Sequence, residues 1–151
     1  LDVLRDDPER GIMCVTVQAN LGGALVATGR FRAGVTLLKQ SLERARREQY
    51  RRPMALALTK LGVAHMGRKR PGIAREYLRQ SDLVAEKGKE SYYDILFINA
   101  YLNWQMAREG GRTTQERIHF GRLKFLRSLL ESRFPEVDAF DAIVRGEMKY
   151  A

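Results

Sequence analysis

The chain has 151 residues, of which 44% are hydrophobic, so it is long enough to bury a core within a single domain, residues 1–151. It carries 27 Lys and Arg against 18 Asp and Glu, a formal net charge of +9. A single cysteine, Cys14, excludes a disulfide scaffold and favours a cytoplasmic protein, and no apolar run is long enough for a membrane span. Cys14 lies among apolar residues, so we expect a buried thiol.

The charge is unevenly distributed along the chain. Residues 30–80 hold 14 Lys and Arg against 3 Asp and Glu, whereas the rest of the chain holds 13 against 15. Arginine outnumbers lysine 20 to 7, and the guanidinium fork suits carboxylates and phosphates. An acidic partner would therefore match residues 30–80 best.

Residues 1–7 resemble the end of a preceding helix, so we expect the chain to be a fragment of a longer protein. Asp7-Pro8 is typical of an N-cap followed by proline in the first turn. We predict a helix over residues 8–28 that Gly29 ends, and a second helix over residues 31–48. Together they form a first helical hairpin.

A second hairpin follows the linker at residues 49–53. Its helices are predicted over residues 53–66 and 71–87, with Gly67 and Gly88 as the C-terminal stops. The spacing of apolar residues in both helices matches that in the first hairpin.

The third pair begins at Ser91, which we expect to cap an almost wholly apolar helix over residues 92–109. Gly110-Gly111 ends this helix, and Thr113 with Glu116 forms a capping box for a helix that reaches residue 133.

Pro135 begins a last helix, predicted over residues 135–147, with acidic residues early and basic residues late. Such a polar-faced helix is typical of a cap on a helical stack.

The sequence contains an ungapped internal match at a 40-residue offset. Residues 20–24 align with residues 60–64, and the same offset pairs four further identical residues. These pairs are Arg30 with Arg70, Leu38 with Leu78, Gln40 with Gln80 and Ser41 with Ser81. An internal repeat of this length in helical sequence predicts an all-α stack of hairpins.

Both copies resemble the tetratricopeptide repeat. The residues that carry the resemblance are Leu21-Gly22 and Leu61-Gly62, Ala24 and Ala64, Gly29, Gly34 and Ala74, Leu38 and Leu78, and Ser41 and Ser81. The resemblance implies a right-handed superhelix of about three hairpins, over residues 8–48, 53–88 and 91–133, with a capping helix. The match departs from the family in having a longer repeat than usual, and in Leu25 and His65, which replace its usual aromatic residue.

The resemblance also implies a non-enzymatic domain that binds a peptide or a partner segment in a concave groove. The alternative is the regulatory (sensor) domain of a bacterial helix-turn-helix transcriptional regulator, because such regulators carry long repeats of this type. We expect no membrane partner, and a homodimer is one option for the assembly.

The first helix of each hairpin lines the groove in this family. The implied positions are Thr16, Ala19, Asn20, Gly23, Val26 and Ala27, then Leu56, Thr59, Lys60, Val63, Met66 and Gly67. A further 40-residue step reaches Asn99 and Asn103. The predicted ligand-binding residues are Asn20, Thr59, Lys60, Val63, Met66, Asn99 and Asn103.

An asparagine amide can pair with a peptide backbone, although surface asparagines often bond only to water. The carboxylate clamp of some family members does not carry over, because Ala19 and Gly23 stand where it needs Lys and Asn.

A basic edge is predicted at the turns within the hairpins. Its residues are Arg30, Arg32, Arg68, Lys69, Arg70 and Arg112. Such a row suits an acidic protein segment or phosphates. Cations near helix ends also aid solubility and offset the helix dipole, and we favour this second interpretation. Nucleic-acid binding through the basic edge stays as a less favoured alternative.

Enzymatic motifs and cofactor or metal sites are not expected. His65 and His119 are far apart in the chain and have no neighbours at metal-ligand spacing. We expect His65 to pack between helices and His119 to cap a helix or face solvent. The aromatic residues of the third pair are assigned to packing, namely Phe97, Tyr101, Trp104, Phe120, Phe125 and Phe134.

Overall fold

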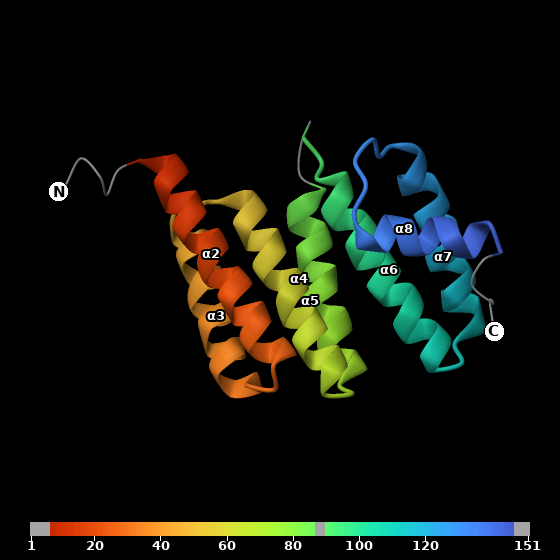
Figure 1. The fold of residues 1–151 in the computed structure, drawn as a ribbon, viewed down its shortest axis with the longest axis horizontal. Coiled ribbons are helices and arrows are strands. Elements are labelled where there is room, and N and C mark those ends of the chain that lie inside the picture. The colour runs from red at the N-terminus through yellow and green to blue at the C-terminus, as the bar shows by residue number, and fades with distance from the viewer. Residues whose placement is uncertain (1–6, 87–89, 147–151) are drawn as a thin grey trace. The chain divides into compact units, whose positions relative to one another are not determined.

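The computed structural model describes residues 7–86 and 90–146, which contain seven α-helices and no strand (Figure 1). The helices are α2 (Pro8–Ala27), α3 (Phe31–Arg47), α4 (Arg51–Gly67), α5 (Pro71–Ala85), α6 (Tyr93–Glu109), α7 (Thr113–Ser128) and α8 (Pro135–Val144). Antiparallel pairs form in sequence as α2 with α3, α4 with α5 and α6 with α7, and α8 follows. The prediction of an all-α protein built from consecutive hairpins is confirmed.

The chain divides into two compact units, Leu1–Ser91 and Tyr92–Ala151. Unit 1 holds the two hairpins that match each other in sequence, and unit 2 holds the third hairpin with α8. Each unit is described by itself below.

Several helix ends differ from the predictions. α4 begins at Arg51, inside the expected linker, and α7 ends at Ser128 rather than at residue 133. α8 ends at Val144 rather than at residue 147. The predicted stop at Gly88 and most of the predicted helix end at residues 1–7 lie outside the described residues.

The N-cap at Asp7 is confirmed, because its carboxylate accepts a hydrogen bond of 3.1 Å from the Glu9 backbone N–H. The caps at Ser91 and Thr113 are wrong. The N-cap residues are Tyr92 and Arg112, neither of which makes a side-chain capping bond. Thr113 is the first helical residue because the preceding turn, rather than a side chain, sets where α7 begins.

The same turn joins the helices of all three pairs. The backbone N–H of Arg30 donates to Leu25 O at 2.8 Å, that of Arg70 to His65 O at 2.9 Å and that of Arg112 to Ala107 O at 2.8 Å. The residue before each arginine has a positive φ, 90° at Gly29, 54° at Lys69 and 67° at Gly111. Lys69 therefore adopts a left-handed conformation that glycine adopts without strain in the other two turns.

In each hairpin of unit 1, equivalent contacts hold the two helices together. Ser41 Oγ donates to Val15 O at 3.0 Å, and its repeat counterpart Ser81 donates through Oγ to Ala55 O at 2.9 Å. A Cβ atom on Gly62 would lie 2.8 Å from Leu78 Cδ2, which explains why the paired helices need a small residue there. The internal match in the sequence thus corresponds to a match in structure.

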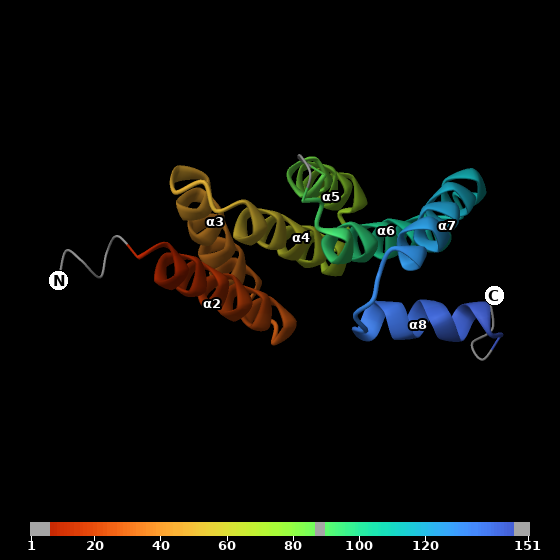
Figure 2. The same cartoon turned by 90° about the horizontal axis from the view of Figure 1, so that it is seen from above.

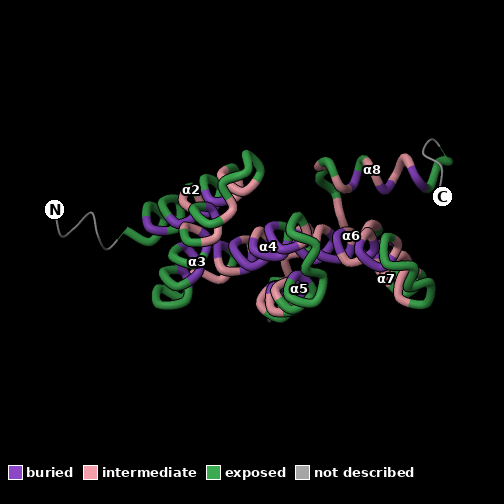
Figure 3. Tube along the Cα trace, turned by 90° about the horizontal axis from the view of Figure 1, so that it is seen from below, coloured by how far each residue is buried: buried purple, intermediate pink, exposed green. Residues whose placement is uncertain are grey.

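The core of unit 1 lies where α4 packs on the first hairpin. Leu38 and Leu42 of α3 meet Ala57, Leu58 and Leu61 of α4. α4 is buried along most of its length, whereas α2 has long exposed stretches (Figure 3).

Aromatic rings form the core of unit 2. Phe97 lies 5.9 Å from Phe134 and 5.7 Å from Phe140, and Phe120 lies 5.4 Å from Phe140 between ring centroids. The assignment of Phe97, Phe120 and Phe134 to packing is confirmed. Phe125 is an error, because 64% of it is exposed.

Helix α8 crosses the α6–α7 pair (Figure 1) and lies on one side of it (Figure 2). Beyond its aromatic contacts, it is fixed by a two-pronged ion pair in which Arg127 Nε and Nη2 donate to Asp141 at 2.9 and 3.1 Å. This pair holds the pKa of Asp141 below its ordinary value. The predicted C-terminal helix that follows the third pair is confirmed.

Among the described residues, no helix combines the length and apolar character that a membrane crossing needs.

Candidate binding groove

A hollow lies between α2 and α4, the first helices of the two hairpins of unit 1. It has a volume of about 200 Å³. Its lining residues are Gly23, Val26, Ala27, Lys60 and Val63. All five are positions that the family resemblance implies for the groove.

The Lys60 side chain crosses from α4 to α2 at Gly23. A Cβ atom on Gly23 would lie 3.5 Å from both Cδ and Nζ of Lys60. The lysine therefore lies against the α2 backbone at Gly23. Within residues 7–86 and 90–146, no hydrogen bond or ion pair of the Lys60 ammonium is found.

Asn20 and Met66 extend this surface along the two helices. Asn20 is exposed one turn before Gly23, and Met66 is half-buried one turn after Val63. These predicted ligand-binding residues therefore lie next to the hollow without lining it.

Thr59 does not belong to the groove. Its exposed fraction is 7%, and its hydroxyl lies 2.9 Å from the Ser81 hydroxyl on α5. The predicted position is wrong because Thr59 faces the partner helix of its own hairpin.

Asn99 and Asn103 belong to unit 2, and the 40-residue step assigns them to the wrong positions. The N-caps Tyr50 and Tyr92 define a 42-residue offset between the second and third hairpins, and the turn residues Arg70 and Arg112 define the same one. With this offset Asn99 corresponds to Ala57, a core position, rather than to Thr59. Asn99 is indeed fully buried, and Asn103 is half-buried.

The predicted basic edge has five exposed residues in unit 1. They are Arg30, Arg32, Arg68, Lys69 and Arg70. The Arg68 guanidinium lies 4.3 Å from the centroid of the Phe31 ring, a cation–π distance. Arg112 occupies the equivalent turn of unit 2 and is also exposed.

Helix dipoles explain only part of the basic edge. Arg68 follows the C-terminus of α4, where a cation is stabilised, but Arg30 and Arg70 are N-cap residues, where a cation meets the positive end of the dipole. Of these three arginines, only Arg68 is placed to offset a helix dipole.

His65 packs between helices, as predicted. Its ring stacks on Tyr77 at 5.5 Å and meets Phe31 edge-on at 5.6 Å. Burial, with the charges of Arg70 and Lys39, lowers the pKa of His65, and no partner for its Nδ1 is found in the described part of the chain. Burial and these two charges therefore disfavour the protonated ring.

His119 is half-buried in the middle of α7, so it is not a helix cap. Burial lowers its pKa, and so do the charges of Arg122 and Arg112.

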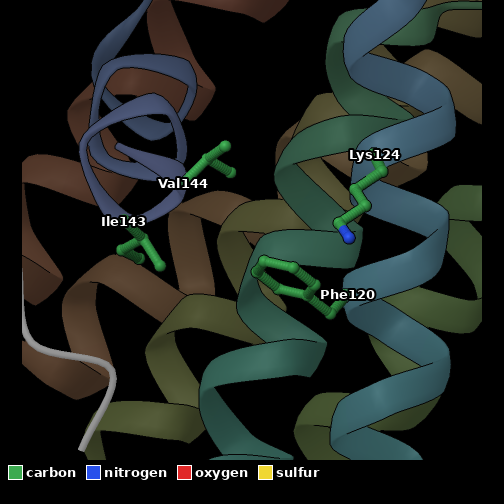
Figure 4. A pocket seen from close by; sticks show the side chains of 4 residues that line it. All are labelled: Phe120, Lys124, Ile143 and Val144. Atoms are coloured by element: carbon green, nitrogen blue, oxygen red, sulfur yellow. The ribbon is translucent and has the colours of Figure 1, made fainter. Parts of the chain in front are cut away.

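Two further hollows were not foreseen. One, of about 340 Å³, lies between α7 and α8 of unit 2 and is lined by Phe120, Lys124, Ile143 and Val144 (Figure 4). The other, of about 370 Å³, lies along α5 and is lined by Gly72, Ile73, Glu76, Tyr77 and Gln80. No group of three His, Cys, Asp or Glu residues arranged to hold a metal ion occurs in the described residues.

Comparisons of the chain with models of protein families, with curated proteins and with solved structures found no match. The internal correspondence of the hairpins is therefore the basis for the choice of site. We prefer the α2–α4 hollow to the other two because its lining residues lie on the first helices of the two matching hairpins.

Proposed function

We propose that the chain is a non-enzymatic domain of tetratricopeptide type, a right-handed superhelix of hairpins, that binds a segment of a partner protein in the α2–α4 hollow. The observation that supports this most is that Lys60 lies against Gly23 in a hollow that Val26 and Val63 also line. A single cation in an apolar recess suits a segment with one carboxylate next to an aliphatic side chain.

The charge of unit 1 supports an acidic partner. The 14 Lys and Arg of residues 30–80 against 3 Asp and Glu create a positive field that attracts an acidic segment from a distance. The field raises the association rate, while the hollow selects the side chain that enters.

Binding of short labelled peptides, measured by fluorescence anisotropy, tests the proposal. Peptides that combine acidic and aliphatic residues should bind better than the same peptides with Asn and Gln in place of Asp and Glu. Lys60→Ala should weaken binding about tenfold, or ~1.4 kcal/mol. Lys39→Ala is the matched control, because Lys39 is an exposed lysine of α3 outside the hollow.

A second variant separates occupation of the hollow from damage to the fold. Gly23→Ala places a methyl group 3.5 Å from Lys60, an ordinary contact, and should stabilise the helix by ~0.5–1 kcal/mol. It should also reduce peptide affinity because the methyl group fills part of the hollow. Equal affinity of Lys60→Ala, Lys39→Ala and the wild type would refute the assignment.

A further inference from the structure

The outer face of α2 is apolar and carries no charged residue from Gly11 onwards. Residues 11–29 contain no Asp, Glu, Lys or Arg. Met13, Val17 and Leu21, spaced by four residues on one side of the helix, are 61%, 60% and 55% exposed. A helix face that contacts water normally carries charged residues, so this row has the character of an interface.

The second hairpin shows what such a face does in this fold. At the 40-residue offset, Val17 and Leu21 correspond to Ala57 and Leu61. Ala57 and Leu61 are both fully buried where α4 packs on the first hairpin. The row on α2 therefore occupies the stacking position of a first helix. Within unit 1, no helix of residues 7–86 covers it.

Cys14 belongs to the same face. It was expected to be buried, but it is exposed, and its counterpart Met54 is partly buried against the core of unit 1. The expectation failed because only part of the apolar run faces the core: Val15 is fully buried, whereas Met13 and Cys14 are exposed.

We propose that this face is a dimer interface on which α2 of a second copy packs antiparallel. A two-fold contact uses the same patch on both copies, so the patch must be complementary to itself, as an uncharged apolar row is. Elsewhere unit 1 is strongly cationic and repels a second copy, whereas residues 11–29 do not.

The spacing of the row defines the contact. Met13 and Leu21 lie four residues on either side of Val17, so a two-fold axis at Val17 brings Met13 against Leu21 of the second copy and the two Val17 residues together. Helix axes 8–10 Å apart then leave roughly 4–5 Å between the Val17 Cα atoms, close to disulfide geometry. Cys14 would lie too far from its own symmetry mate to form a disulfide.

Analytical ultracentrifugation over a concentration series tests the oligomeric state. The wild type should be a dimer that dissociates on dilution, and Val17→Asp should be a monomer because it places two carboxylates opposite each other. Ile118→Asp is the matched control, since Ile118 is a β-branched residue of α7 that is 56% exposed. It should remain a dimer.

Oxidative cross-linking tests the geometry. Cys14→Ser combined with Val17→Cys should form a covalent dimer, whereas the wild type, with Cys14 alone, should not. A wild type that is monomeric at every concentration would overturn the proposal, and so would a dimer that Ile118→Asp dissociates and Val17→Asp does not. A monomer in which Cys14 is protected from a thiol reagent would also overturn it, because the same chain would then cover the face.

Discussion

Helices α2 and α4 occupy the same position in successive hairpins, yet their stacking faces have opposite environments. Leu61 of α4 is fully buried, whereas Leu21, its counterpart in α2, is 55% exposed. Both leucines follow the same pattern in the sequence. The comparison teaches that the neighbouring hairpin, rather than the residue type, decides which apolar face belongs to the core.

Residue size follows the same division. Where α4 is packed on both the first hairpin and α5, its buried residues are mostly small, as at Ala55, Ala57 and Ala64. At the counterparts of Ala57, α2 has Val17 and α6 has Asn99. Close packing on two sides of α4 leaves no room for a large residue at that position.

The largest effect that distinguishes the two helices should come from truncating the paired leucines. Leu61→Ala should lower the free energy of unfolding by ~2–5 kcal/mol, because it leaves a cavity in the core of unit 1. Leu21→Ala in the Val17→Asp monomer should change it by no more than ~0.5 kcal/mol. Urea denaturation measures both, and equal losses would contradict the comparison.

The next effect concerns the position where the two helices of a hairpin come closest, which holds Gly34 in the first hairpin and Ala74 in the second. A Cβ on Gly34 would lie 2.6 Å from the Gly22 carbonyl oxygen, so Gly34→Ala should cost ~1–3 kcal/mol in unfolding free energy. Ala74 is the counterpart of Gly34 in the second hairpin, and Ala74→Gly should cost only ~0.5–1 kcal/mol.

The control for these glycine variants is Gly121→Ala, since nothing lies within 4 Å of a Cβ at this exposed position of α7. It should stabilise the protein slightly. If Gly34→Ala behaved like Gly121→Ala in thermal unfolding, the helices of the first hairpin would not be in the close contact described here.

A smaller difference should separate the equivalent serines. Ser41→Ala removes one buried hydrogen bond to a carbonyl and should cost ~1 kcal/mol in unfolding free energy. Ser81→Ala should cost ~1–2 kcal/mol, because it also removes a hydrogen bond to the Thr59 hydroxyl. The double mutant of Thr59→Ala with Ser81→Ala should lose less than the sum of the two single losses, because both single variants remove the same Thr59–Ser81 hydrogen bond.

The sequence predicted the features that depend on local signals. Gly29 and Asp7 mark helix ends through backbone conformation and side-chain capping, and the ungapped internal match pairs Gly23 of α2 with Val63 of α4, which line the same hollow. The spacing of apolar residues was sufficient for the hairpins.

Features that depend on packing between distant residues could not be predicted in the same way. The 40-residue offset of the first two hairpins becomes a 42-residue offset between the second and third, so Asn99 was assigned to a groove rather than to a core position. Cys14 and Phe125 were expected in the core because apolar residues alone do not reveal which face has a neighbour. The role of Thr59 depends on Ser81, which lies on the next helix of the chain.

The smallest change in stability at neutral pH is expected at the position that holds Leu25 in the first hairpin and His65 in the second. The pKa of His65 is lowered from 6.5 by burial against Phe31 and Tyr77 and by the charges of Arg70 and Lys39. The unfolded chain therefore binds a proton at a higher pH than the folded chain, so stability is fully present above pH 6.5 and declines as the pH falls towards the lowered pKa.

His65→Leu, which gives the second hairpin the residue of the first, should remove this part of the acid-induced loss and change stability little at higher pH. Denaturant midpoints measured over a pH series give the profile. His119→Leu is the control, because the pKa of His119 is lowered by burial in unit 2 and its replacement leaves the contribution of His65 intact. If the His65→Leu profile ran parallel to that of the wild type through this pH range, the ring would be titrating in the folded protein much as it does in the unfolded chain, and burial between the two hairpins would not control its charge.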